Sequence, residues 1–203
     1  MVFVDILTSQ LFVLGFAGLV ISYLVLRGYM SSRRGTRNSN DLKSGVAPIA
    51  LLGLYMFISG IWGQFAWPLP GSYNILFYDL YTLAGLLVIS FAWSLYNDGD
   101  LRSTGVFGLL LGLVTIYYGY VGYSLNMTQS PIALLGLYFL FGIAGVLGCP
   151  LTLLLNNMRA GIKSKGGVWP ALVAVFLIVL VLGSLLSIFI AGSAIPVHLA
   201  TPP

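Results

Sequence analysis

Six apolar stretches, each about as long as a membrane is thick, constrain this chain more than any other feature. They cover residues 10–27, 46–67, 75–96, 105–124, 131–155 and 169–192. A helix needs about 20 mainly apolar residues to cross a bilayer, and within lipid only helices and closed barrels satisfy their own backbone hydrogen bonds. We therefore predict an all-α, polytopic membrane protein with six transmembrane helices that form a single domain, residues 1–203.

Composition excludes the other classes of protein. Charged residues make up 7% of the chain, against about 25% in soluble domains. The chain has five Asp, no Glu, one His and one Cys, which is too few ligands for a haem or zinc site built from His or Cys clusters. We expect no metal, no cofactor and no catalytic residues.

The basic residues predict an orientation. All nine Lys and Arg residues lie at or between spans one and two, three and four, or five and six. The positive-inside rule then puts these connections in the cytoplasm and both termini outside the cell, in a multi-pass protein of the plasma membrane. Seven of these cations are predicted to contact anionic lipid head groups: Arg33, Arg34, Arg37, Lys43, Arg159, Lys163 and Lys165. Because the same charges are the topology signal, we expect the lipid bilayer and not nucleic acid as their partner.

An octapeptide, Pro-Ile-Ala-Leu-Leu-Gly-Leu-Tyr, occurs twice, at residues 48–55 and 131–138. The match places span two on span five, so the halves would be residues 1–97 and 104–203. With three spans each, the halves would have opposite orientations, which is the inverted repeat of many transporters. The alternative is that two helices merely share a Pro start and a Gly packing face.

Glycines recur at helical spacing in the fourth and fifth spans. Small residues let transmembrane helices approach closely, so we predict a packing role for Gly105, Gly108, Gly112, Gly119, Gly122, Gly136, Gly142 and Gly145. This face serves either the packing of the six-helix bundle or the contact with another subunit.

Asp79 is the one charged side chain well inside a predicted span. A carboxyl group in a bilayer is costly and needs hydrogen-bond donors. Candidate partners and site residues nearby are Gln64, Asn74, Tyr78, Tyr81 and Thr82. This corner is either a proton, cation or ligand site or a hydrogen bond that tethers helices.

Part of this corner resembles a known family. Pro70, the run Tyr73-Asn74-Ile75-Leu76-Phe77 and Asp79 are similar to a family of uncharacterised archaeal multi-pass membrane proteins, a domain of unknown function of about this size. The resemblance implies a six-span fold and an archaeal membrane. It implies no activity, cofactor or catalytic residue.

Three functions stay open at this point. The first is an accessory or structural subunit of a larger membrane complex, such as a respiratory one, or a homo-oligomer. The second is a small transporter or channel for a neutral or weakly charged solute, which should contain a polar path between the halves. The third is a quinone- or lipid-binding protein that uses the Asp79 corner.

Overall fold

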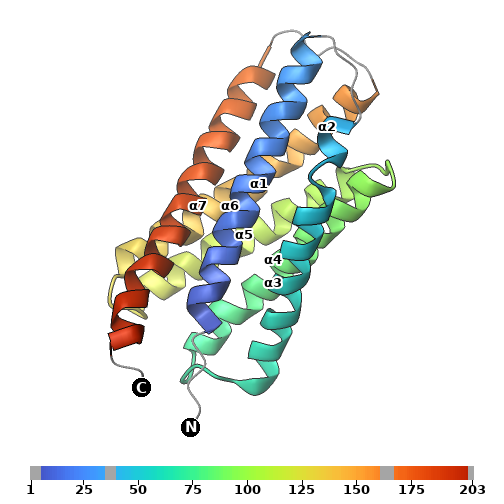
Figure 1. Cartoon of the computed structure of the whole chain (residues 1–203). Coiled ribbons are helices and arrows are strands. Elements are labelled where there is room, and N and C mark those ends of the chain that lie inside the picture. Colours follow the sequence, from blue (N-terminus) through green and yellow to red (C-terminus); the bar gives the residue numbers. More distant parts are fainter. Residues whose placement is uncertain (1–5, 35–39, 161–166, 201–203) are drawn as a thin grey trace.

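All six predicted spans are helices in the structure, a computed structural model that describes residues 6–34, 40–160 and 167–200 (Figure 1). The helices are α1 (Ile6–Arg34), α2 (Asn40–Lys43), α3 (Val46–Ala66), α4 (Tyr73–Tyr96), α5 (Arg102–Ser124), α6 (Pro131–Arg159) and α7 (Trp169–Ala200). Six of them, all except the short α2, are long and apolar enough to cross a membrane, and the described residues contain no strand. The predicted fold class is therefore confirmed.

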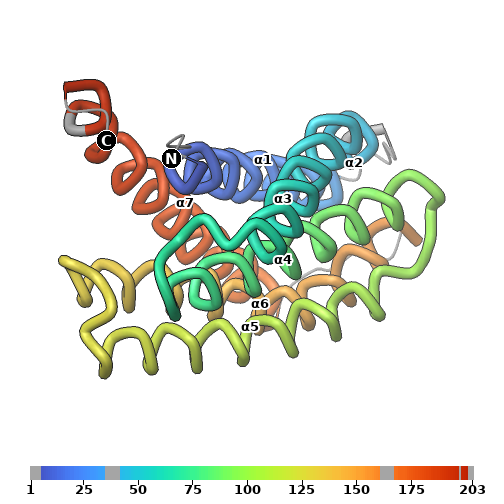
Figure 2. The backbone as a smooth tube through the Cα atoms, turned by 90° about the horizontal axis from the view of Figure 1, so that it is seen from below, coloured from blue at the N-terminus to red at the C-terminus, as the bar shows by residue number. Residues whose placement is uncertain are grey.

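The six long helices form a ring. Contacts join α1 to α7, α7 to α6, α6 to α5, α5 to α4, α4 to α3 and α3 back to α1. The most extensive contacts are within the pairs α5–α6, α3–α4 and α1–α7. Figure 2 shows α1 and α5 on opposite sides of the bundle, while α1 also contacts α6. A ring of this kind can enclose a space along its axis.

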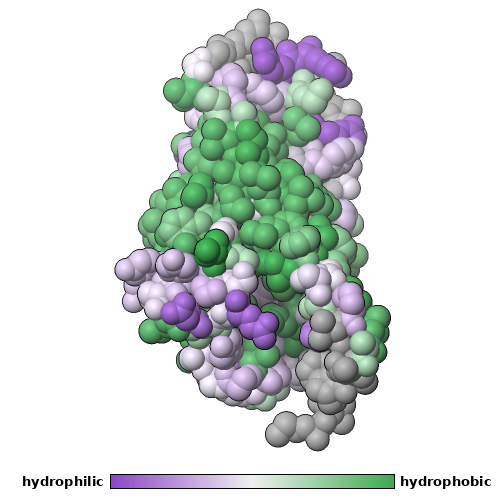
Figure 3. All heavy atoms as spheres, turned by 90° about the vertical axis from the view of Figure 1, so that its left-hand side faces the viewer, coloured by the Kyte–Doolittle hydropathy of each residue, from purple (hydrophilic) through white to green (hydrophobic). Residues whose placement is uncertain are grey.

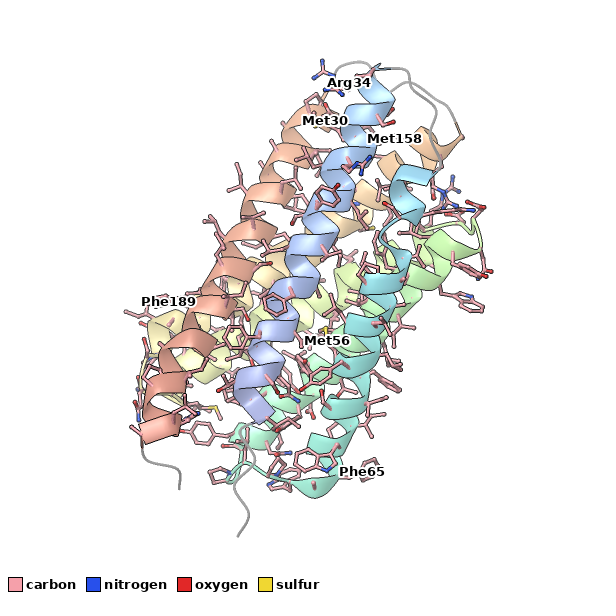
Figure 4. The ribbon with its side chains drawn as sticks, in the orientation of Figure 1. Met30, Arg34, Met56, Phe65, Met158 and Phe189 are labelled. Carbon is pink, nitrogen blue, oxygen red and sulfur yellow. The ribbon has the colours of Figure 1, made fainter. Side chains whose placement is uncertain are left out.

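The surface has the distribution expected of a membrane protein. Figure 3 shows a band of hydrophobic residues between two more hydrophilic ends. Phe189 of α7 points away from the bundle with 72% of its surface exposed, whereas Met56 of α3 lies inside with none exposed (Figure 4). Apolar side chains that face outward this way are stable in lipid, because lipid tails are as apolar as they are.

The two ends of the bundle differ in charge. We call one end the basic end, because five described cations lie there: Arg33, Arg34, Lys43, Arg102 and Arg159. At the far end, α1 begins, α7 ends, and the α3–α4 and α5–α6 connections turn (Figure 1). Arg37, Lys163 and Lys165 lie outside the described residues. The chain is a multi-pass membrane protein by this structure, and its orientation remains a prediction.

Two helices continue through prolines. Pro150 lies inside α6, which ends at Arg159, whereas the predicted span ends at residue 155. Pro196 lies inside α7, which ends at Ala200, whereas the predicted span ends at residue 192. A proline removes one backbone hydrogen bond, and neighbouring helices let a membrane helix tolerate that loss.

The repeated octapeptide begins helices at opposite ends of the bundle. Pro48 lies in the first turn of α3 at the basic end, and Pro131 is the first residue of α6 at the far end. The environments of the two copies differ. Tyr55 is 41% exposed and its hydroxyl lies 2.8 Å from Ser9 Oγ, whereas Tyr138 is buried and donates to the Leu76 carbonyl. The inverted repeat therefore stays a prediction.

Candidate functional site

Asp79 joins three helices. Gln64 Nε2 of α3 donates to Asp79 Oδ1 at 3.2 Å, and the Tyr118 hydroxyl of α5 donates to Asp79 Oδ2 at 3.3 Å. Gln64 is one of the donors that the sequence offers. Tyr118 is far away in sequence and was missed. One signal could have found it: Asp79 lies six residues after the start of α4 and Tyr118 six residues before the end of antiparallel α5, so both lie at the same depth.

The other candidates of this corner serve neighbouring backbone groups. Asn74 is buried, donates to the Gly63 carbonyl at 3.0 Å and accepts from the Leu69 backbone N–H at 3.3 Å. It thereby holds the α3–α4 turn. Thr82 donates to the Tyr78 carbonyl at 2.7 Å.

Tyr78 packs beneath α3 where that helix has a glycine. Its side chain is fully buried, and any Cβ at Gly63 would overlap its ring. The contact between α3 and α4 here thus requires glycine. The corner brings Asp79 together with Gln64 and Tyr118 and does not bring Tyr78, Tyr81 or Thr82 into hydrogen-bond contact with it.

A partly open cavity of about 240 Å³ lies between the helices, and its lining comes from all six long helices. Along α1 the lining runs from Leu7 to Val25, a rise of about 27 Å. This is close to the ~30 Å thickness of the hydrocarbon core. The sequence does not predict this space, because only the closure of the ring creates it.

The cavity is apolar and contains no charge. Its described lining has no Asp, Glu, Lys, Arg or His, and its largest residues are Leu, Met, Phe and Tyr. Asp79 and Gln64 are not part of it. Three of its hydroxyl groups donate to backbone carbonyls: Thr115 to Leu111, Tyr138 to Leu76 and Thr152 to Cys149.

Gln10 is one of two exceptions among the polar groups of the lining. Its side chain is 2% exposed, and its amide nitrogen has no hydrogen-bond partner among the described residues. A buried donor left in this state costs about 1–3 kcal/mol, and such a group in a native protein needs an explanation. Tyr81 also lines the cavity. Its hydroxyl lies beside Ser59 but makes no hydrogen bond of good geometry.

Glycines bring α5 and α6 together beside this cavity. A Cβ at Gly112 would lie 2.5 Å from the Gly142 carbonyl oxygen, and one at Gly145 would lie 2.7 Å from the Gly108 carbonyl oxygen. The other glycines of the predicted face also lie against helices of the same chain. A Cβ added at each would contact these neighbours: α6 at Gly105, Tyr138 at Gly119, Leu134 and Leu76 at Gly122, and Leu186 at Gly136. The face lies inside the bundle.

A cluster of charges at the basic end holds the α4–α5 loop. Asp98 accepts from Lys43 and from Arg159 Nη2, the latter at 3.0 Å, and Arg159 Nη1 donates to the Gly99 carbonyl at 2.8 Å. Hydrogen bonds from Lys43 and Arg159 hold the pKa of the Asp98 carboxyl below its usual value. Lys43 and Arg159, both predicted to contact lipid head groups, are thus paired within the protein.

Asp100 makes a second set of bonds in the same loop. It accepts from the Arg102 backbone N–H at 2.9 Å and from the Asn156 side chain. The backbone bond is the main reason why the pKa of Asp100 lies below its usual value. Of the head-group candidates, Arg33 lies over the Tyr29 ring, and Arg34 is exposed. Within the described residues, no three His, Cys, Asp or Glu side chains are grouped as a metal site would require.

Comparison with known proteins identifies the family. The model of the family described as "Protein of unknown function (DUF981)" matches residues 1–201. The chain belongs to this family. The match covers the apolar spans and the Asp79 corner alike, so membership of a family of unknown function is confirmed over nearly the whole chain. The archaeal origin implied by the resemblance stays a prediction. No curated protein and no solved structure matches.

Proposed function

We propose that this protein binds a long-chain lipid in the partly open cavity between its six helices. The single observation that carries the proposal is the cavity, which is about 240 Å³ in volume, lined along α1 from Leu7 to Val25, mainly apolar, and free of charged groups in its described lining. Ligand sites in proteins are mostly apolar, with a few polar groups that fix orientation. A hydrocarbon chain matches such a lining, and a hydrophilic solute does not.

This proposal keeps the third function suggested by the sequence and moves its site. The lipid site lies on the axis of the bundle and does not include Asp79. A transporter for a polar solute is less well supported, because the polar path that it requires between the halves is not found in the described lining.

Two glycines make a matched pair of variants for the test. A Cβ at Gly148 of α6 or at Gly192 of α7 would meet no atom within 4 Å. Gly148 lines the cavity, and Gly192 does not. A leucine at position 148 therefore adds apolar volume at the cavity wall without a backbone clash, and a leucine at position 192 controls for the substitution itself.

The experiment is mass spectrometry of the lipids that stay bound to the full-length protein after a detergent wash that removes annular lipid. We expect the wild type and Gly192→Leu to retain one class of long-chain lipid at a fixed ratio to protein. Gly148→Leu should lose it. Equal lipid content in the two variants, or no retained lipid in the wild type, would overturn the proposal.

A role as a subunit of a larger membrane complex is the second candidate. It is favoured by the hydrogen bonds from Gln64 and Tyr118 to Asp79, because a non-catalytic subunit has no need of a free carboxylate. Gentle extraction from native membranes followed by a native gel tests it. Partner proteins at fixed stoichiometry would support the role, and migration of the chain alone or as a homo-oligomer would count against a complex with other proteins.

A further inference from the structure

The two polar groups of the cavity that lack a hydrogen-bond partner, Gln10 and Tyr81, lie toward one end of it. Gln10 lies four residues after the start of α1, and Tyr81 eight residues after the start of α4. Both helices begin at the far end of the bundle (Figure 1). The lining toward the basic end, which includes Val25 and Leu155, is apolar apart from Thr104 and Thr152.

Those two threonines are already engaged. Thr152 Oγ1 donates to the Cys149 carbonyl at 2.7 Å, and Thr104 Oγ1 lies 3.2 Å from Ser90 Oγ, within hydrogen-bond distance. Besides the Tyr81 hydroxyl, the Gln10 amide is therefore the donor of the described lining that has no hydrogen-bond partner. A bound molecule with an oxygen acceptor at this level would satisfy it.

We infer that the ligand is an uncharged, single-chain lipid whose terminal hydroxyl or carbonyl oxygen accepts a hydrogen bond from Gln10. This inference rests on the proposed function. The chain would run from Gln10 toward Leu155 and the basic end. The end group is uncharged because the described lining offers no counter-ion, and a buried charge without a partner is costly. Long-chain alcohols and prenyl quinones belong to this class, whereas phospholipids and sulfated lipids do not.

The test compares three probes with the same chain and different ends: hexadecanol, hexadecyl sulfate and hexadecane. Hexadecanol and hexadecyl sulfate carry a photoactivatable diazirine near the chain end distant from the polar group, and hexadecane carries it near one end. The full-length protein is placed in phosphatidylcholine vesicles, irradiated and mapped by peptide mass spectrometry. We expect hexadecanol to label residues at the basic end of the cavity, such as Leu151 and Leu155, and to exceed hexadecyl sulfate there.

The variant Gln10→Leu tests the hydrogen bond. Loss of one such bond should lower hexadecanol labelling of the cavity by about 2- to 10-fold and leave hexadecane labelling unchanged. Gln129→Leu, which changes an exposed glutamine of the α5–α6 connection, should behave as the wild type. Gel filtration checks that each variant is folded. If Gln10→Leu does not fold, the comparison of the three probes on the wild type still decides whether the end group of the ligand is uncharged.

The outcomes separate this inference from the proposed function. If hexadecyl sulfate labels the cavity as well as hexadecanol does, or if Gln10→Leu binds hexadecanol as the wild type does, the inference is wrong. Loss of that labelling in Gly148→Leu would still support lipid binding. If none of the three probes labels the cavity of the wild type, the proposed function itself fails.

Discussion

Tyr118 and Asp79 lie at the same depth on antiparallel neighbouring helices, and the Tyr118 hydroxyl donates to Asp79 Oδ2 at 3.3 Å. With Gln64 on the other carboxyl oxygen, this contact links α5 and α3 through α4. The contact between α4 and α5 is among the less extensive of the ring. A polar link here therefore stabilises a joint that apolar packing alone holds less firmly.

Replacing Asp79 should lower stability. Asp79→Leu leaves two partly buried donors without an acceptor, so we expect a loss of about 1–3 kcal/mol. Tyr118→Phe removes one donor and should cost less, about 0.5–1.5 kcal/mol. The measurement is thermal unfolding of the detergent-solubilised protein followed by tryptophan fluorescence. An Asp79→Leu protein as stable as the wild type would show that the carboxylate does not hold the helices together.

Adding one methyl group to the α5–α6 contact should also destabilise the protein. A Cβ at Gly112 would lie 2.5 Å from the Gly142 carbonyl oxygen and 2.8 Å from the Val146 backbone nitrogen. Because backbone atoms cannot move aside cheaply, we expect Gly112→Ala to cost about 1–3 kcal/mol. The same thermal assay measures it. Gly192→Ala is the control, since its new methyl group meets no atom within 4 Å, and an equal loss in both variants would refute the packing argument.

Acid should release the α4–α5 loop. The pKa of Asp98 is lowered in the folded protein by hydrogen bonds from Lys43 and Arg159. The stabilisation is therefore complete above the ordinary Asp value of about 3.9 and is lost as the pH falls through the lower, folded-state pKa. Protection of the backbone amides in residues 97–101, taken relative to the intrinsic exchange rate at each pH, should fall in that acidic range. Asp98→Asn should exchange faster already at neutral pH and respond less to acid, whereas identical pH profiles for both proteins would contradict the role of Asp98.

Orientation can be read from the two ends of α4. Ser72 and Asn97 flank this helix, and both are exposed. In a Cys149→Ser background, single cysteines replace each of them in turn. If the basic end is cytoplasmic, a maleimide that cannot cross membranes should label Ser72→Cys on intact cells and label Asn97→Cys only after permeabilisation. The reverse pattern would invert the predicted topology.

The sequence by itself determined the fold class, because a span depends on local properties. Each of the six helices is long and apolar enough to cross a bilayer on its own, and the bilayer requires such segments to be helical. The ends of the helices were less predictable. Two of them, α6 and α7, end beyond the predicted spans and contain Pro150 and Pro196, because a proline ends a membrane helix only where its neighbours do not compensate.

The candidate site was only partly within reach of the sequence. A lone carboxyl group in a span needs donors, which directed attention to Asp79 and Gln64, and the two are bonded. Tyr118 required knowledge of which helix lies next to α4. The cavity and the unsatisfied amide of Gln10 exist only because six helices close into a ring. Hydropathy determines which segments cross the lipid. The order of the helices around the ring depends on side-chain contacts between segments that are distant in sequence, and only the tertiary structure decided these contacts.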